Sequence, residues 1–513
     1  MFKRFIFFLF VAFIFFSCNV FDASVKEKTL VVLLDYDVVD LDPIESNDDE
    51  TSTVLCEIYE CLFKYDEHLK PVFSLVDNMK VEDDTEYTFH IKKNIYFHNG
   101  EELKASDVKF SLQRAKNSRS VGYLFESIKE DSFEVIDDYT VKFSLSRPDA
   151  TVLMSLCHTA ASIVCEKSAI PKVDNKDKTI LSFVPIGTGP FKFVSLKAGD
   201  IMLERFKDYY GSKPYFQFMQ FKTDSRYRER VEELEEGNAD IIASVNLFEI
   251  EKCKKSSSIK LYNTQGFGTE YLGMNMKRKP LDDIRVRKAI AKAIDVELIN
   301  RVVSNGLYEN ATAPCAPGIP YSIANKRKVE KRDVEKAKRL LFEAGYLEGL
   351  NLTFLISESF EQMEIASKIK EQLSRIGINI EMRVLAWGEF FDAIDKGEAD
   401  IFLIEWIPDV PDPYSVLYGS FHSSVPYEDG NYVGCEDSLL DELLDEGATT
   451  QDEWKRQLVY EKAQKRIMEI VPAVFIYVNS LNLAAIRNYE GIVMNPLGHP
   501  YLAYVKPMLI DEE

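Results

Sequence analysis

The sequence predicts an α/β fold in which helices and strands alternate along the chain. Apolar residues at 333–344 fall on one helical stripe that stops at Gly345, and a second helix pattern at 364–376 stops at Gly377. Residues 378–384 then alternate apolar and polar side chains, which is the period of a strand. Helices that alternate with strands in this way indicate an α/β architecture.

Shorter patterns in the first half of the chain agree with this class. Residues 29–34 are rich in strand-forming side chains, and residues 86–97 alternate apolar and polar positions. An Asn-Gly dipeptide at 99–100 is typical of a hairpin turn, and Ser106 with Asp107 can cap a following helix. We therefore expect a strand, a tight turn and a helix in that order.

A short self-similarity indicates two lobes. The sequence GNADIIA at 237–243 returns as GEADIFL at 397–403, and each copy leads from an acidic, helix-like stretch into an apolar strand. A chain of 513 residues is also too long for one core and should form about two to four domains. A cleft between two lobes is a common site for ligands.

The net charge of −22 excludes some classes of partner. Binding to nucleic acid or to an anionic membrane surface needs clustered Lys and Arg, so we expect no nucleic-acid partner. The charge does not identify the ligand, because net charge affects solubility and steering rather than fold.

The N-terminus has the features of an export signal. Lys3 and Arg4 precede an apolar run at 5–16, which Ser17 and Cys18 follow. A run of this length fits the hydrophobic region of a signal peptide and is too short for a membrane span. The Ser-Cys pair resembles a bacterial lipoprotein processing site, in which the cysteine is acylated and becomes the mature N-terminus. We expect a lipid anchor on Cys18; an ordinary cleaved signal peptide or a short anchor is the alternative.

The stretch at 401–413 contains the first candidate site. An apolar run at 401–404 is short enough for a buried strand and leads to Trp406. Asp409 and the Pro-Asp-Pro sequence at 411–413 then break regular structure. Ligands of open α/β sheets lie beyond the carboxyl ends of the strands. The pattern predicts a ligand wall and a charge anchor; a core Trp and a turn-capping Asp are the alternative.

Catalytic and metal-binding patterns indicate no enzyme. The chain has no G-x-S-x-G, no H-E-x-x-H and no phosphate loop ending in G-K-[ST], and its many carboxylates single out no acid–base pair. The six histidines lack metal-ligand spacing. Seven cysteines remain besides Cys18, so at least one is unpaired. We expect no catalytic residue, no metal and no cofactor.

Five motifs follow one another along most of the chain. They are YTFHIKKNIYFHNGEELKASDVKFSLQRA at 87–115, GTGPFKF at 187–193, LGMNMKRKPLDDIRVRKAIAKAID at 272–295, DVEKAKRLLFEAGY at 333–346 and DPYSVL at 412–417. In this order they resemble the family 5 extracellular solute-binding proteins of peptide-type ABC transporters. The resemblance implies a periplasmic binding protein-like α/β fold, with two lobes, an inserted third domain and a ligand cleft between the lobes.

The resemblance also implies a division of the chain and a set of binding residues. After a signal peptide at 1–17, the expected parts are a first lobe at 18–50, 177–265 and 488–513, an inserted domain at 51–176, and a second lobe at 266–487. In family members that bind short peptides, an Asp on the loop after a strand-end Trp holds the α-ammonium, and the W-x-x-D spacing is met here by Trp406 and Asp409. Trp387, Tyr271 and Tyr123 match further aromatic residues of the ligand wall.

The function implied is that of a lipid-anchored receptor that encloses short peptides and passes them to a membrane permease. The body would lie in the periplasm or at the cell surface, as a monomer attached to the membrane through its lipid alone. A non-peptide solute, such as an oligosaccharide, an opine or a metal chelate, is the alternative within the family. An exported hydrolase and a surface adhesin or scaffold are the alternatives from other classes.

Overall fold

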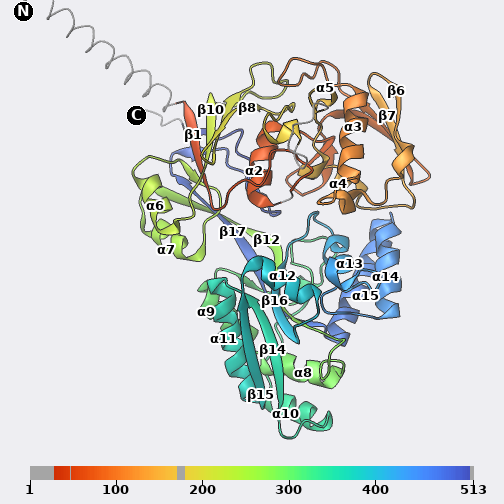
Figure 1. Cartoon of the computed structure of the whole chain (residues 1–513), viewed down its shortest axis with the longest axis vertical. Coiled ribbons are helices and arrows are strands. Elements are labelled where there is room, and N and C mark those ends of the chain that lie inside the picture. Colours follow the sequence, from red (N-terminus) through yellow and green to blue (C-terminus); the bar gives the residue numbers. More distant parts are fainter. Residues whose placement is uncertain (1–27, 47, 170–178, 509–513) are drawn as a thin grey trace, which may run out of the picture.

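The structure, a computed structural model, describes residues 28–46, 48–169 and 179–508. Figure 1 shows an upper and a lower body joined by two long strands. The predicted signal peptide and Cys18 lie outside the described residues. The observed architecture is mixed α/β, as the sequence predicts.

An 11-stranded sheet runs through both bodies. Its strands are β1 (Thr29–Leu34), β8 (Phe191–Lys197), β9 (Asp200–Arg205), β10 (Phe218–Thr223), β11 (Ile241–Ile242), β12 (Ile259–Met274), β13 (Glu309–Asn310), β14 (Leu350–Ser357), β15 (Ile378–Leu385), β16 (Ile401–Trp406) and β17 (Ala473–Ile486). The order is β15-β14-β16-β12-β17-β11-β1-β10-β9-β8, and β13 pairs with β17. β14 is parallel to β15 and β16, whereas β12 is antiparallel to β16 and β17.

The strands β12 and β17 carry the chain between the two bodies (Figure 1). They pair along most of their length, with a register shift between Gln265 and Thr269. Leu483 of β17 lies in the core of the upper body, and Ile476 of the same strand lies in a core of the lower body. This antiparallel pair therefore joins the first lobe to the second, and the expected boundary at residue 266 falls inside β12.

Helices complete both lobes and the inserted region. They are α2 (Asp49–Ile58), α3 (Ala105–Lys116), α4 (Val152–Ser155), α5 (Glu166–Ala169), α6 (Tyr227–Glu235), α7 (Leu247–Lys255), α8 (Ile284–Ala293), α9 (Val296–Ser304), α10 (Val334–Glu343), α11 (Phe360–Ser374), α12 (Trp387–Asp395), α13 (Pro413–Phe421), α14 (Ser438–Thr449) and α15 (Glu453–Ile470). Within the three described ranges, no helix combines the length and the apolar composition that a membrane span requires.

The helix stops predicted in the second lobe are confirmed. α10 ends at Glu343, two residues before Gly345, and α11 ends at Ser374, three residues before Gly377. Both glycines have positive φ, +94° and +85°, the left-handed conformation that ends many helices. α11 begins at Phe360, four residues before the predicted start at residue 364. The prediction used the apolar stripe, which covers only part of the first turn of the helix.

A smaller sheet forms the core of the inserted region at the upper right of Figure 1. Its order is β4-β5-β7-β6, and a separate hairpin pairs β2 with β3. The strands are β2 (Phe63–Tyr65), β3 (Pro71–Phe73), β4 (Val76–Glu82), β5 (Glu86–Ile91), β6 (Glu134–Asp137) and β7 (Thr140–Ser144); β18 (Tyr489–Glu490) pairs with β19 (Lys506–Pro507) elsewhere. The strand predicted at 86–97 therefore ends at Ile91, and its apolar face packs Phe89 against Phe143.

Two local predictions near this sheet have different outcomes. The Asn-Gly turn is confirmed, since Gly100 has φ +86°. The cap of α3 is not Ser106, which lies inside the helix. Asp107 closes a capping box instead, its carboxylate accepting a hydrogen bond from the backbone N–H of Lys104 (2.9 Å).

Helix α2 belongs with the upper body by its packing. Val54, Leu55 and Ile58 lie in the same buried cluster as Leu30 of β1. The expected boundary between residues 50 and 51 falls inside this helix. α2 therefore packs in the first lobe, and Asp49 at its N-terminal end is close enough to Glu405 of the lower body for its charge to act there.

Candidate ligand-binding cleft

The indole of Trp406 is held against the second lobe. Its Nε1–H donates a hydrogen bond to the carbonyl oxygen of Ser415 (2.9 Å), in the first turn of α13. A Cβ atom at Gly419 would lie 3.0 Å from the ring, and a Cβ atom at Gly430 would lie 3.0 Å from it as well. The two glycines therefore let the backbone lie close to the half-buried ring, which gives it a fixed position at the end of β16.

The loop after Trp406 is fixed by a buried ion pair. The Asp412 carboxylate accepts hydrogen bonds from Arg456 Nη1 (2.6 Å) and Nη2 (2.8 Å), and both side chains are buried. Asp412 also caps α13, accepting a hydrogen bond from the backbone N–H of Tyr414 (2.8 Å). The turn-capping carboxylate of this stretch is therefore Asp412.

Asp409 meets a residue from the inserted region. The Tyr123 hydroxyl donates a hydrogen bond to Asp409 Oδ1 (2.8 Å), across 286 positions of sequence. The backbone N–H of Asp409 donates to the Ser415 hydroxyl (3.1 Å), which ties the loop to α13. Tyr123 itself lies on a 3-10 turn at Gly122–Phe125 and is 54% exposed. Two of the predicted site residues thus face each other between the inserted region and the second lobe.

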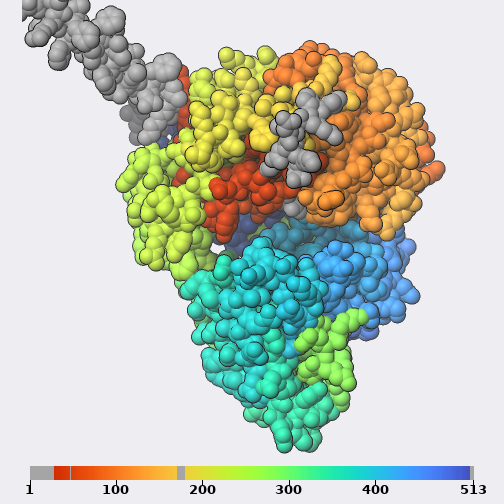
Figure 2. All heavy atoms as spheres, in the orientation of Figure 1, coloured from red at the N-terminus to blue at the C-terminus, as the bar shows by residue number. Residues whose placement is uncertain are grey.

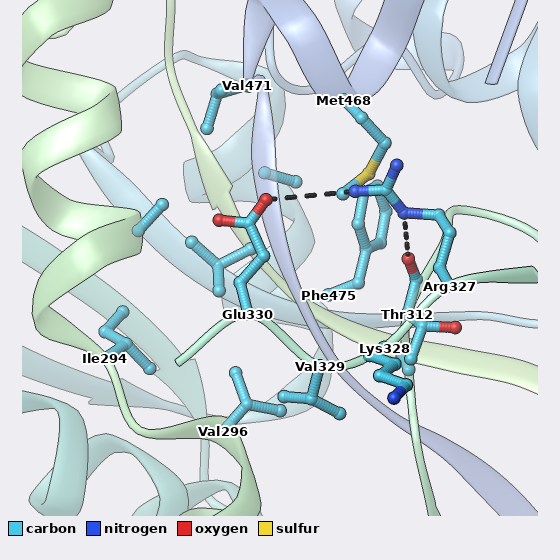
Figure 3. Close-up of a pocket in the computed structure, with 14 residues that line it drawn as sticks. Ile294, Val296, Thr312, Arg327, Lys328, Val329, Glu330, Met468, Val471 and Phe475 are labelled. Carbon is cyan, nitrogen blue, oxygen red and sulfur yellow. Dashed lines mark hydrogen bonds and ion pairs between the residues drawn. The ribbon is translucent and has the colours of Figure 1, made fainter. Parts of the chain in front are cut away.

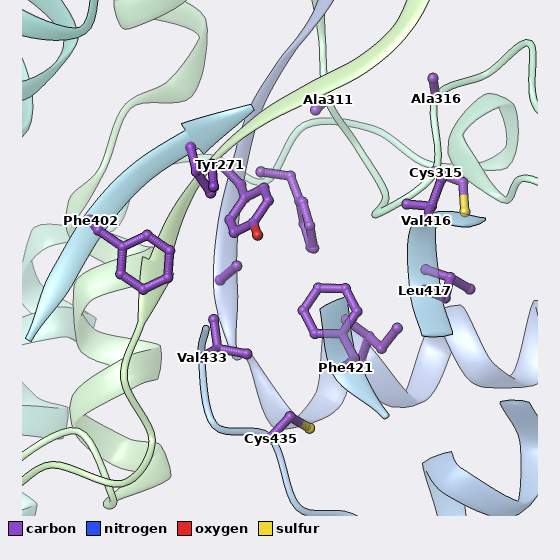
Figure 4. Close-up of a cluster of buried hydrophobic side chains, with 14 of the residues drawn as sticks. Tyr271, Ala311, Cys315, Ala316, Phe402, Val416, Leu417, Phe421, Val433 and Cys435 are labelled. Carbon is purple, nitrogen blue, oxygen red and sulfur yellow. The ribbon is translucent and has the colours of Figure 1, made fainter. Parts of the chain in front are cut away.

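The other two predicted wall residues lie in different surroundings. Tyr271 is 3% exposed and lies in the core of the second lobe, where Figure 4 shows it among buried apolar side chains. Burial raises the pKa of its hydroxyl. Trp387 is 61% exposed at the start of α12, with its ring 4.8 Å from that of Phe391. Tyr271 therefore lies in the core of the second lobe and not at an exposed surface, whereas Trp387 lies at the surface of the lobe.

Sequence reasoning missed two buried histidines, His158 near Asp409 and His499 near His158. Burial lowers the pKa of His158, and the nearby charge of Asp409 only partly opposes this. Burial and then His158 lower the pKa of His499 to about 4. Both imidazoles are thus neutral at pH 7, so neither supplies a fixed positive charge to Asp409. No spacing in the sequence marks these two residues, which are 341 positions apart.

Contacts between the lobes enclose this region. From the hairpin β2–β3, Tyr65 and Leu69 pack against the core of the second lobe. The backbone N–H of Ala150 donates to the carbonyl oxygen of Ala448 in α14 (3.2 Å). Figure 2 shows a hollow between the red residues of the first lobe and the cyan residues of the second.

A separate small cavity lies within the second lobe and is unsuited to a peptide. Figure 3 shows it beside the Arg327–Glu330 ion pair (3.8 Å), with Met468 and Phe475 in its wall. Its volume is about 90 Å³, whereas small-molecule sites usually measure about 300–1,000 Å³. None of the five predicted ligand-binding residues lines it.

Two buried carboxyl groups on the other side of β16 have raised pKa values. Glu405 precedes Trp406 and therefore faces the opposite side of the sheet. Burial, followed by the charges of Glu361 and Asp49, raises the pKa of Glu405 to about 8. Burial and the charges of Glu405 and Glu361 also raise the pKa of Glu270. The second lobe thus holds carboxyl groups that are protonated at pH values where most carboxyls are ionised.

Stability should therefore fall as pH rises. Between the ordinary pKa of 4.5 and about 8, folded Glu405 retains a proton that the unfolded chain has released, so the free energy of unfolding decreases with pH across this window. Glu405→Gln keeps a neutral group of similar shape and should make the slope shallower. Denaturant unfolding at pH 5, 6, 7 and 8 measures this slope; an equal slope in both proteins would contradict the assignment.

The described side chains form neither a metal-binding group nor a disulfide. In that part of the chain, no group of three or more His, Cys, Asp or Glu residues is placed to hold a metal ion. The seven cysteines there are free thiols: Cys56, Cys61, Cys157, Cys165, Cys253, Cys315 and Cys435.

Comparison with known proteins shows the family of the chain. The family model for bacterial extracellular solute-binding proteins, family 5 Middle, matches residues 70–428. The dipeptide-binding protein of Escherichia coli (strain K12) is 27% identical over 443 residues, covering 81% of this chain and 82% of that protein.

Two solved structures are similar in sequence and in fold. The periplasmic binding protein DppA from Helicobacter pylori, in complex with the peptide STSA, has a TM-score of 0.79 and 27% identity, covering 93% of this chain and 98% of that one. The binding protein AgaA of A. tumefaciens R10, in complex with agropinic acid, has a TM-score of 0.76 and 27% identity, covering 90% and 94%. The chain belongs to the family 5 bacterial extracellular solute-binding proteins.

Proposed function

We propose that this protein is the substrate-binding component of an ABC importer, and that it encloses short peptides between its lobes and delivers them to a membrane permease. Family membership and the peptide ligands named for similar proteins support this function. The main structural observation behind this proposal is the position of Asp409. It lies on a loop at the end of β16 that is hydrogen-bonded to α13, and it faces Tyr123 of the inserted region. A carboxylate between two domains suits an enclosed ammonium, which needs a counter-charge.

In this proposal each predicted residue has a role. The peptide ammonium binds Asp409, and Trp406 forms the flat wall beside the first residue of the peptide. The Tyr123 hydroxyl of the inserted region donates a hydrogen bond to the same carboxylate. The peptide ammonium and the inserted region therefore both bind Asp409. Tyr271 backs the wall, and Trp387 lies at the rim of the cleft. The protein works as a monomer and carries out no catalysis.

Closure would use the two long strands. We propose the division into a first lobe at 18–50, 177–265 and 488–513, an inserted domain at 51–176 and a second lobe at 266–487, in which the helix α2 at the first boundary packs against the first lobe. The register shift between Gln265 and Thr269 then lies at the junction and serves as the bending point. Ligand shifts the population towards the closed form by its extra affinity for that form.

Calorimetry combined with small-angle scattering tests this function. Di- to pentapeptides with free amino termini should bind, and saturating peptide should reduce the radius of gyration relative to peptide-free protein. An oligosaccharide or an opine serves as the comparison ligand, because a similar protein is known in complex with agropinic acid. Tight binding of the non-peptide solute, with no binding of any peptide, would overturn the proposal.

The lipid anchor is a further part of the proposal. The apolar run at 5–16 is followed by Ser17 and then by Cys18. This position of Cys18 supports acylation of its thiol. Two or more acyl chains anchor a protein stably, whereas one gives only marginal binding.

Cys18→Ser should therefore release the protein from membranes, so that most of the protein is found in the soluble fraction. Cell fractionation and detergent partitioning measure this. If the variant remains as membrane-bound as the unaltered protein, the cysteine is not acylated.

A further inference from the structure

Three carboxylates come together on the face of the main sheet opposite Trp406. Glu405 of β16 lies directly across from Glu270 of β12. Glu270 in turn pairs with Tyr477 of β17. The Tyr477 hydroxyl donates a hydrogen bond to Oε1 of Glu361 in the first turn of α11 (2.6 Å). Strand register and one phenolic hydrogen bond thus hold the three side chains, called here the acid group, in one place.

Among the described residues, the acid group has no cationic partner. Among residues 28–46, 48–169 and 179–508, neither Glu270, Glu361 nor Glu405 forms an ion pair with Lys, Arg or His. Glu270 is 3% exposed and receives one long hydrogen bond, from Gln362 Nε2 (3.4 Å). Burying carboxylates without a counter-charge is costly, so this arrangement needs either bound protons or a cation from outside.

One carboxylate oxygen of the acid group is buried without a hydrogen-bond donor of ordinary geometry. The Oε1 atom of Glu405 is buried and accepts no hydrogen bond of ordinary geometry, although the Asn479 amide lies nearby. A Cβ atom at Gly268 would lie 2.2 Å from this oxygen. The carboxylate therefore packs directly against the backbone of β12 at this glycine, where a larger residue would not fit. A buried acceptor with no donor is an unmet hydrogen-bonding capacity that a ligand can satisfy.

The acid group lies where the two lobes meet. Asp49, at the start of α2 in the first lobe, is close enough for its charge to act on Glu405. On the same side, the ring of Phe248 from α7 lies 5.3 Å from the ring of Phe360, which precedes Glu361 in α11. Figure 2 shows a hollow between the red residues, which include α2, and the second lobe.

We propose that the acid group of Glu270, Glu361 and Glu405 receives the cationic side chain of the bound peptide, a lysine ammonium or an arginine guanidinium, so that basic peptides are the preferred ligands. The proposal rests on the peptide-binding function above and adds the class of peptide. An organic cation fits better than a metal ion, because no set of described His, Cys, Asp and Glu side chains has metal-binding placement. An ammonium or a guanidinium has several donors and can reach carboxylates that are further apart.

Matched peptides test the preference without any mutation. Calorimetry at pH 7.5 compares trialanine with tripeptides that carry lysine at the second or third position, and with the same peptides carrying norleucine or acetyl-lysine. The best lysine peptide should bind about ten- to a hundredfold more tightly than its norleucine and acetyl-lysine counterparts. Equal affinities at both positions would overturn the proposal.

Variants then locate the preference. Glu405→Gln should abolish most of the difference between lysine and norleucine peptides and leave the norleucine affinity within about threefold of its original value. Glu371→Gln, an exposed carboxylate on the same helix as Glu361, is the matched control and should keep the full preference. Retention of the preference in Glu405→Gln would overturn the assignment of the site.

The outcome is separable from that of the proposed function. If neutral peptides bind and lysine peptides bind no better, the acid group is not a side-chain site, but the protein remains a peptide receptor. If no peptide binds, both proposals are wrong. Binding of calcium or zinc alone, lost on Glu405→Gln, would overturn the organic-cation proposal in favour of a metal site.

Discussion

Replacing Asp409 by Asn should lower the affinity for a short peptide with a free amino terminus by about two orders of magnitude or more. The substitution keeps the shape of the side chain and removes its charge. Because the ammonium would then be enclosed without its counter-charge, the loss should approach the 3–5 kcal/mol that is roughly typical of a broken buried pair. Calorimetry on the two proteins with one peptide measures it.

An N-acetylated version of the same peptide is the control for this result. It has no ammonium, so it should bind the unaltered protein poorly and should be affected much less by Asp409→Asn. The four affinities form a double-mutant cycle that isolates the interaction between ammonium and carboxylate. If acetylation leaves the affinity of the unaltered protein unchanged, Asp409 is not the ammonium anchor.

Replacing Asp412 by Asn should destabilise the second lobe by about 3–5 kcal/mol. The Arg456 guanidinium is buried and would lose the carboxylate to which it makes two hydrogen bonds, at 2.6 and 2.8 Å. It would keep its bond to the carbonyl oxygen of Gly447 (2.9 Å), which cannot neutralise its charge. Denaturant unfolding followed by fluorescence, since Trp406 lies beside this loop, measures the change.

Glu371→Gln provides the matched control for stability. Glu371 pairs with Arg375 at 2.6 Å, but both side chains are 55% exposed. Exposed pairs of this kind contribute at most about 0.5 kcal/mol. If Asp412→Asn costs as little as Glu371→Gln, the buried pair does not hold the binding loop, and the fixed position of Asp409 needs another cause.

The predictable parts of the fold were those that local chemistry determines. Periodicity and glycine stops gave α10, α11 and β15 to within a few residues, because amphipathic spacing and left-handed glycines act within a single element. The strand exit at Trp406 was predictable for the same reason. The prediction that Ser106 and Asp107 cap α3 was right for Asp107 and wrong for Ser106, because the helix begins at Ala105 and this places Ser106 inside its first turn.

The parts that could not be predicted depend on pairing between distant segments. Glu270 and Glu405 are 135 positions apart and meet only because β12 and β16 pair in one register. A shift of that register by one residue would send each side chain to the other face of the sheet. The contact between Tyr123 and Asp409 likewise depends on how the inserted region is placed, which no local pattern encodes.

The most direct test of the account is the identity of the molecules that the protein carries. Purified protein is denatured, the small molecules released are separated from the chain, and they are analysed by mass spectrometry. The account predicts short peptides with free amino termini, enriched in lysine or arginine, and predicts that Asp409→Asn protein releases far less of them. Recovery of a single non-peptide solute in amounts equal to the protein, unchanged in the Asp409→Asn variant, would contradict it.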